Sequence, residues 1–445
     1  RPLRLEPCLM NDPLVDCVKM LNQLGAALTR ENDGVSAMPA APLAAPDKVV
    51  HVGCSAWNFY LALGHYLGRP SRAKFVGDPD LRLADFSVAR RFAGQMGARL
   101  IQAVPKSDGL PVRLECSGVL PGKVVFPADA PVELAEGIML AAPSYERAIT
   151  LDLSAMPERA LAFARILPVL NAAGADVRRE GDVLHFQPCA LSIPSEPTLP
   201  VEPELAVFLM GLAPALGGEV RLEGQWPTWP GTEAGLDLLR QTGAKVECSA
   251  TEILARSLKP LAELPAAFAL PEGLPASWRP LAVALSTMTA LRGGRAVLPA
   301  GLEAEENVVE SYLHAAGLAL DAEGCLVAWK PGDDMEEAEE QDEEGRPVRK
   351  SRPALQARGW NAPDAPWAVA LALAACARGK QEGFKLGNPG VLTELYPPFW
   401  VLYNNLPEPH MTRENKEVPA EPVKSRRRVI TSAVAVPPPL EEEDY

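Results

Sequence analysis

A glycine and a serine before an apolar segment mark the place where the sequence best allows ligand chemistry. Gly53-Cys54-Ser55-Ala56 follows the expected strand Lys48–Val52 and precedes an apolar helix that begins at Trp57. Free backbone N–H groups and the helix dipole at such a turn favour a bound anion. Most turns of this kind only reverse the chain, so a purely structural turn is the alternative interpretation.

The spacing of histidines and cysteines indicates neither a metal site nor a disulfide framework. None of the five histidines forms an HxxxH-type pair, and His65 and His314 are interpreted as surface or hydrogen-bonded helix residues. The eight cysteines are scattered without a CxxC pair, which is typical of reduced thiols in a cytoplasmic protein. We therefore expect a cytoplasmic protein without a metal or a cofactor.

Length and charge restrict the class of protein further. A chain of 445 residues exceeds what one hydrophobic core usually supports, so two domains are expected. The net charge of −14 argues against nucleic acid as a partner, because neutralising phosphates requires clustered lysines and arginines. No signal peptide is recognisable at residue 1 and no apolar run is long enough to cross a bilayer, so no membrane partner is expected.

Five amphipathic helices end at a glycine and are followed by a strand, which indicates an internal repeat. A helix that ends in a left-handed turn favours glycine there, because glycine has no Cβ. The five glycines are Gly25, Gly97, Gly174, Gly243 and Gly317. Apolar helices recur in phase with them, with a period of roughly 70–75 residues. These helices are expected at about 57–67, 133–142, 204–214, 280–292 and 366–377.

Each repeat reads as strand–helix–strand–helix–strand–strand and contains one helix without a polar face. Such a helix must be buried at the centre of its domain, so three repeats around one axis would form a domain. Six repeats predict an α/β (α+β) chain with two domains, residues 1–224 and 225–407. The first repeat lacks its apolar helix, and we expect that the true N-terminus precedes Arg1 rather than that a half-repeat was lost.

Two charged segments stand outside the repeats. Residues 331–353 are too densely charged to be buried, so we expect a solvated insertion, with docking of a protein partner as the alternative. Residues 408–445 are rich in proline and charge and are expected to form a disordered tail, which is the other candidate surface for a partner.

The repeat pattern up to about residue 407 resembles that of the enolpyruvyl transferases, specifically the 3-phosphoshikimate 1-carboxyvinyltransferases (EPSP synthases). The resemblance implies two inside-out α/β barrel domains that close on the substrates. It also implies transfer of a carboxyvinyl group from phosphoenolpyruvate to shikimate 3-phosphate, in aromatic amino-acid biosynthesis, without a cofactor. The partners would then be small anionic substrates.

The motifs that carry the resemblance are altered in the first half of the chain. Asn11-Asp12-Pro13 resembles the family's Ser-Asp-Asp-Thr helix start. Gly53–Trp57 stands at its phosphoenolpyruvate-binding turn, where the indole of Trp57 would crowd the site. A phosphoenolpyruvate-binding arginine of the family falls on Ala84. Arg82 is the candidate substitute, because residues two apart on a strand share a face.

The motifs are altered in the rest of the chain as well. The family's Ser-Ser-Gln, which grips both substrates, ends at Glu133, and its catalytic aspartate falls on Pro280. Its Lys-Glu-x-Asp-Arg run becomes Gly301–Glu306, without the lysine or the arginine. Its Asp-His-Arg becomes Asp364–Pro366, and its last lysine becomes Glu394. The family's N-terminal catalytic lysine would precede the first residue of this sequence.

Three hypotheses follow from the resemblance. The chain is a working EPSP synthase, a catalytically inactive relative that binds a protein partner, or an enzyme of the same fold with a less anionic ligand. The candidate substrate-binding residues are Gly53, Ser55, Arg82, Glu133 and Arg279. In the third hypothesis, the candidate acid/base residues are Glu133, Glu305 and Glu306.

The orientation of charged side chains separates these hypotheses. Basic side chains that face the cleft between the domains would support the first, because both substrates are anions. The basic residues in question are Arg82, Arg90, Arg91, Arg279 and Lys385. A cleft lined by carboxylates would support the third.

Overall fold

The structure is a computed structural model, in which residues Arg1–Pro409 form one compact unit. It describes residues 3–6, 8–31, 33–38, 43–192, 197, 199–257, 268, 278–302, 305–328, 359–378 and 384–406. The expected insertion at 331–353, the tail at 408–445 and a strand expected at 354–358 lie outside these residues. None of the described helices combines the length and apolar character needed to cross a membrane.

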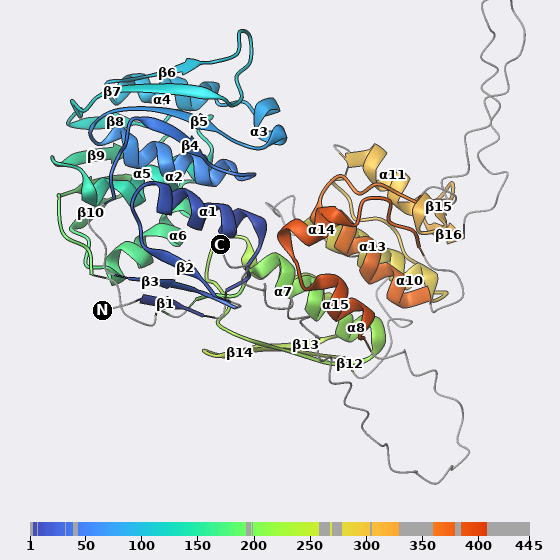
Figure 1. The fold of residues 1–445 in the computed structure, drawn as a ribbon. Coiled ribbons are helices and arrows are strands. Elements are labelled where there is room, and N and C mark those ends of the chain that lie inside the picture. Colours follow the sequence, from blue (N-terminus) through green and yellow to red (C-terminus); the bar gives the residue numbers. More distant parts are fainter. Residues whose placement is uncertain are drawn as a thin grey trace, which may run out of the picture. The chain divides into compact units, whose positions relative to one another are not determined.

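The first half of the chain alternates helices with three small sheets (Figure 1). Its helices are α1 (Asp12–Gln23), α2 (Ala56–Leu67), α3 (Pro79–Leu83), α4 (Ser87–Gln95), α5 (Val132–Ala141), the 3₁₀ helix η1 (Ala142–Ser144) and α6 (Arg159–Ala172). Its strands are β1 (Leu3–Leu5), β2 (Leu28–Arg30), β3 (Val35–Ala37), β4 (Lys48–His51), β5 (Pro70–Val76), β6 (Ala98–Gln102), β7 (Val112–Ser117), β8 (Lys123–Val125), β9 (Ile149–Asp152), β10 (Val177–Glu180) and β11 (Val183–Phe186). The strand orders are β1-β3-β2, β4-β5-β7-β6 and β10-β11-β9-β8.

The second half contains more helices and two described sheets, ordered β12-β14-β13 and β15-β16. Its helices are α7 (Pro203–Met210), α8 (Leu212–Leu216), α9 (Thr232–Gln241), α10 (Arg279–Leu291), α11 (Glu306–Ala315), α13 (Ala365–Arg378), α14 (Gly390–Leu395) and α15 (Phe399–Asn404). Its strands are β12 (Gly218–Glu223), β13 (Lys245–Cys248), β14 (Glu252–Ser257), β15 (Leu318–Leu320) and β16 (Leu326–Ala328).

The five glycines expected to end helices do so. Each has a positive φ, between 68° at Gly97 and Gly317 and 99° at Gly25. A side chain with a Cβ is strained at such angles, whereas glycine is not. The helix-ending role of these glycines is therefore confirmed, while the sixfold repeat itself stays a prediction.

The described residues build two separate hydrophobic cores. The first joins side chains from Met20 to Phe186, and the second joins side chains from Ala206 to Phe399. Residues 206–215 thus pack in the second core although they precede the expected boundary at 224/225. The division into two domains stays a prediction.

The first core is centred on α2 and α5, which lie side by side (Figure 1). Glycines allow the two backbones to touch. A Cβ added at Gly64 would lie 2.4 Å from the carbonyl oxygen of Gly137, and one added at Gly137 would lie 2.4 Å from that of Tyr60. The side chains around this contact, such as Leu63 and Ile138, have no exposed surface. The expectation that these apolar helices are buried is confirmed.

Two expected elements differ from the structure. The apolar helix expected at 204–214 is interrupted at Gly211 into α7 and α8, where an added Cβ would lie 2.9 Å from a methyl group of Leu373. The strand expected at 295–298 forms only an isolated bridge between Val297 and Cys325.

The contact between α2 and α5 predicts that a side chain at Gly64 destabilises the fold. The Gly64→Ala variant places a methyl group against a backbone carbonyl that cannot turn aside, so its free energy of unfolding should fall by about 1–3 kcal/mol. Urea denaturation measures this change. Gly94→Ala in α4 is the control, because its added Cβ meets nothing within 4 Å and alanine favours a helix. Equal stability of wild type and Gly64→Ala would contradict the contact.

Candidate functional site

The turn before α2 is packed against a carboxylate of α1. Gly53 has a φ of +72°, and a Cβ added there would lie 2.1 Å from Oδ2 of Asp16. Ser55 is the residue before the first turn of α2, and its side chain makes no capping hydrogen bond. The N-terminus of α2, where the sequence suggested a bound anion, therefore already has an anionic side chain beside it. A carboxylate in this place is favoured by the helix dipole.

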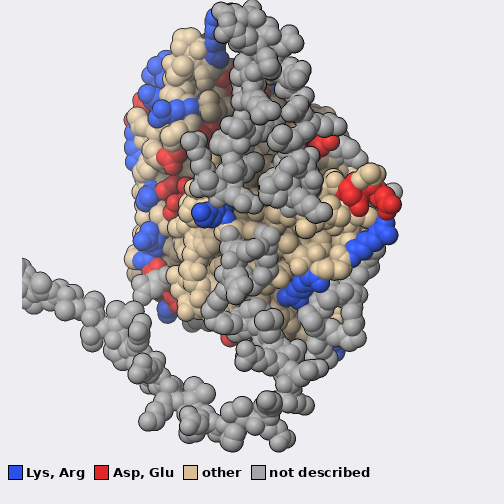
Figure 2. All heavy atoms as spheres, turned by 90° about the vertical axis from the view of Figure 1, so that its right-hand side faces the viewer, with Lys and Arg blue, Asp and Glu red and all other residues tan. Residues whose placement is uncertain are grey.

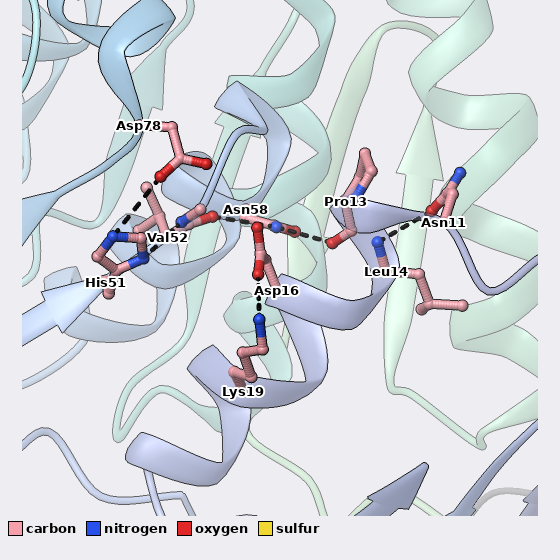
Figure 3. Close-up of polar contacts among 10 residues, drawn as sticks. Asn11, Pro13, Leu14, Asp16, Lys19, His51, Val52, Asn58 and Asp78 are labelled. Carbon is pink, nitrogen blue, oxygen red and sulfur yellow. Dashed lines mark hydrogen bonds and ion pairs between the residues drawn. The ribbon is translucent and has the colours of Figure 1, made fainter. Parts of the chain in front are cut away.

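Hydrogen bonds fix this turn between α1 and the end of β5 (Figure 3). The Asn58 side chain donates to the carbonyl oxygens of Pro13, at 3.0 Å, and Val52, at 3.2 Å. His51 Nδ1 accepts from the backbone N–H of Gly53 at 3.2 Å, and its Nε2 lies 3.7 Å from Oδ1 of Asp78. The contacts with Pro13 and Asp78 tie the turn to α1 and to the residue before α3, whereas the other two lie within the turn itself.

Asp16, Cys54 and Asp78 form a set of possible metal ligands, which the sequence did not suggest. One ligand atom of each lies within 4.8 Å of the others. Burial and the negative charge of Asp16 raise the pKa of the Cys54 thiol to about 11, so a metal would have to displace its proton. Oδ1 of Asp16 is also paired with Lys19 at 2.9 Å. We assign no metal to this set.

A cavity of about 480 Å³ opens beside the start of α1. This volume is within the range of small-molecule sites. The cavity is lined by Met10, Asp12, Val15, Arg30, Glu31, Thr393, Glu394 and Pro397. Three of these residues are acidic and one is basic. Two of them, Asp12 and Glu394, fall in segments that carry the sequence resemblance, so the fold brings these distant segments together.

Trp57 and Glu136 tie α2 to α5. The indole N–H of Trp57 donates to Oε2 of Glu136 at 2.8 Å, and Nη1 of Arg165 lies 3.4 Å from Oε1. The Glu136 side chain is only 2% exposed. Burial raises the pKa of its carboxyl group, against the opposing effects of Arg165 and the Trp57 hydrogen bond. The sequence predicted Glu133, one turn earlier on the same helix and half-buried, as the acid/base and substrate-binding residue, but Glu136 was not predicted.

Arg165 extends this polar group toward the second half of the chain. Its guanidinium lies over the ring of Trp229, with 5.0 Å between the guanidinium carbon and the ring centroid. Such cation–π contacts stabilise by about 0.5–2 kcal/mol, depending on burial. Arg165 therefore contacts both the carboxylate of Glu136 and the ring of Trp229.

Most of the basic residues expected at the site are paired with acidic neighbours. Arg90 is paired with Asp108 at 2.6 Å, and Arg91 is paired with Asp129. Lys385 is exposed. On the face shown in Figure 2, described basic and acidic side chains are interspersed rather than gathered by sign.

Residues of the second half show the same neutralisation. Arg279 is paired with Glu305 at 2.8 Å, and both side chains are largely covered. Pro280 is buried within α10, whereas Glu306 is exposed. Asp364 accepts a hydrogen bond from the backbone N–H of Trp367 at 3.0 Å, and burial raises its pKa. Among the described residues of the second half, the expected arginine, Arg279, is therefore already paired with a carboxylate.

Arg82 lies on a helix, which corrects one sequence-based argument. Residues Pro79–Leu83 form α3, with Asp78 before its first turn and a proline at its first position. The strand geometry that would let Arg82 replace an arginine at position 84 does not apply. Its side chain is exposed and lines a different cavity, together with Gly77.

The buried carboxyl group of Glu136 predicts a pH dependence of stability. Its pKa is raised in the folded state, so its contribution to stability falls as pH rises from the unfolded value, about 4.3, through the folded value. Glu136→Gln should remove this loss, so its free energy of unfolding should rise relative to that of the wild type as pH increases over that window. Urea denaturation from pH 4 upward measures it. Trp57→Phe removes a hydrogen-bond donor to the Glu136 carboxylate, so the loss of stability should extend to higher pH. If the dependence of stability on pH is the same in both variants as in the wild type, Glu136 does not cause it.

A scan of protein families finds none that matches the chain. Two solved structures of EPSP synthase from Acinetobacter baumannii are similar, each with a TM-score of 0.63. They are 20% and 19% identical in sequence, and each match covers 91% of this chain and 89% of that one. The chain therefore has an EPSP synthase-like fold.

Proposed function

We propose that this chain is a binding protein with an EPSP synthase-like fold, whose site takes a small ligand that carries positive charge. Carboxyvinyl transfer between phosphoenolpyruvate and shikimate 3-phosphate is not its activity under this proposal. The observation that supports it is the position of Asp16, whose carboxylate packs against the turn that the resemblance assigns to phosphoenolpyruvate.

The chemistry of carboxyvinyl transfer explains why this position matters. Both substrates carry a phosphate and one carries a carboxylate as well, so a closed site needs several arginine or lysine donors. An anion about 4 Å from an unpaired carboxylate would be repelled by ~4 kcal/mol at the effective dielectric constant of a protein surface. The pairing of Asp16 with Lys19 at 2.9 Å reduces this repulsion. Pro280 also has no group for general acid/base catalysis, which this reaction needs.

The charge of the cavity beside α1 favours a cationic ligand. Asp12, Glu31 and Glu394 contribute three carboxylates to its lining, against the single guanidinium of Arg30. The carboxylate of Glu31 also lies 3.5 Å from the guanidinium of Arg4, so Asp12 and Glu394 carry the argument. An organic cation, such as an amine, would be attracted to this surface and could pair with two carboxylates at once. Its volume, about 480 Å³, accommodates a small molecule but not a macromolecule.

EPSP synthase activity is the second candidate. Arg82 and Arg30 each line a cavity, and no ion pair or hydrogen bond of either guanidinium is found among the described residues. In this alternative, these two arginines replace the basic residues that the motifs lack. The match in fold to EPSP synthase supports it as far as a fold can support an activity.

A direct assay separates the two candidates. The protein is mixed with phosphoenolpyruvate and shikimate 3-phosphate, and phosphate release and thermal stability are measured. We expect no release above background and no shift in melting temperature with either compound, because Asp16 and Glu394 repel both. Phosphate release that disappears in the Arg82→Ala variant would establish the second candidate instead.

Binding of a matched pair of probes tests the cationic ligand. The probes are 1,5-diaminopentane and glutarate, which have the same chain length and opposite charge. By calorimetry, the diamine should bind, more weakly at higher salt, and Glu394→Gln should weaken it about tenfold, or 1.4 kcal/mol. Glu310→Gln, an exposed carboxylate of α11 outside the cavity, is the control. Preference for glutarate, or an equal effect of both variants, would contradict the proposal.

A further inference from the structure

A second cavity, of about 320 Å³, lies where the end of β5 meets α3 and the loop before β7. It shares no lining residue with the cavity beside α1. Its lining consists of Val76, Gly77, Arg82, Val104, Ser107, Leu110 and Pro111. The volume is within the range of small-molecule sites.

The walls of this cavity are held in place by backbone contacts. The N–H of Leu110 donates to the carbonyl oxygen of Leu81 at 2.8 Å, and the N–H of Phe86 donates to that of Asp108 at 3.0 Å. A Cβ added at Gly109 would lie 2.2 Å from the carbonyl oxygen of Arg82, so loop and helix are in direct contact. A cavity with fixed walls binds a ligand without the cost of ordering them.

The loop also contains a strained residue. Lys106 has a φ of 62°, and it is the single non-glycine residue with a positive φ in the described part of the chain. Such a conformation costs on the order of 1 kcal/mol and is common at ligand sites. It tightens the turn in which the N–H of Ser107 donates to the carbonyl oxygen of Val104 at 3.3 Å.

Apolar side chains form most of the surface of this cavity. Val76, Val104, Leu110 and Pro111 contribute the apolar part of the lining. Val104 is 46% exposed, and Leu83, next to Arg82 in the chain, is 91% exposed. Apolar surface left open to water favours a ligand with an apolar body.

Arg82 is the one charged residue of the lining. Its guanidinium has no ion pair or hydrogen bond among the described residues. The carboxylate of Asp108 pairs with other side chains instead, because its Oδ1 accepts hydrogen bonds from Arg90 at 2.6 Å and from Gln102 at 2.7 Å. The hydroxyl of Ser107 donates to the carbonyl oxygen of Arg82 at 3.4 Å, so the guanidinium is the donor left for a ligand. One guanidinium suits a single carboxylate, whereas a compound with a phosphate and a carboxylate needs more donors.

We propose that this cavity binds a small carboxylic acid with an apolar body, whose carboxylate pairs with Arg82 and whose body contacts Val104 and Leu110. This site is independent of the binding of a cationic ligand beside α1, since neither its residues nor its ligand class is shared. Arg82 is shared only with the second candidate function, EPSP synthase activity, which the phosphate-release assay tests separately. The two proposals can therefore fail separately.

Three eight-carbon probes test the site on the full chain by calorimetry: octanoate, octan-1-ol and octylamine. Octanoate should bind at least tenfold more tightly than the alcohol, and the amine should bind most weakly. Arg82→Gln should reduce octanoate to the affinity of the alcohol. Arg147→Gln, which changes an exposed arginine outside the cavity, is the matched control and should have no effect.

A second variant tests the apolar part of the cavity. Val104→Trp fills the space and should weaken octanoate and octanol alike, while circular dichroism confirms that the fold is retained. The proposal is overturned if octylamine binds as tightly as octanoate, if Arg82→Gln and Arg147→Gln have the same effect, or if neither Arg82→Gln nor Val104→Trp weakens octanoate.

Discussion

The direct backbone contact between α2 and α5 is the constraint on which the first half of the structure depends. Two glycines, Gly64 and Gly137, bring the helices together without side chains between them. This places the N-terminal turn of α2 within hydrogen-bonding reach of Glu136 on α5, through the indole of Trp57. A wider helix spacing would leave the Glu136 carboxylate buried without this donor, which is costly.

Electrostatics then decide what the site can bind. The start of α2 and the cavity beside α1 carry the carboxylates of Asp16, Asp12 and Glu394, whereas Arg279 is paired with Glu305. A fold fixes where backbone groups lie, but side chains fix the sign of the charge that a ligand must have. The likeness in fold to EPSP synthase therefore does not by itself set the charge of the ligand.

Local patterns predicted the elements well, and tertiary contacts explain what they missed. The helix-ending glycines and the burial of α2 and α5 follow from short-range rules on backbone angles and apolar periodicity. The position of Asp16 against Gly53 was not predictable, because it depends on how α1 packs. The helix at Arg82 was predictable in principle, since Asp78-Pro79 is a typical helix start, but it was read as the end of a strand.

The carboxylate of Asp16 lies beside the turn that precedes α2 and is paired with Lys19 at 2.9 Å. It is only 16% exposed, so an external anion at this turn would lie beside a fixed negative side chain. An arginine engineered into this turn would find Asp16 first and form an internal ion pair. Any route from this chain to a phosphate-binding enzyme must therefore remove a negative charge before it adds a positive one, so the order of substitutions matters as much as their identity.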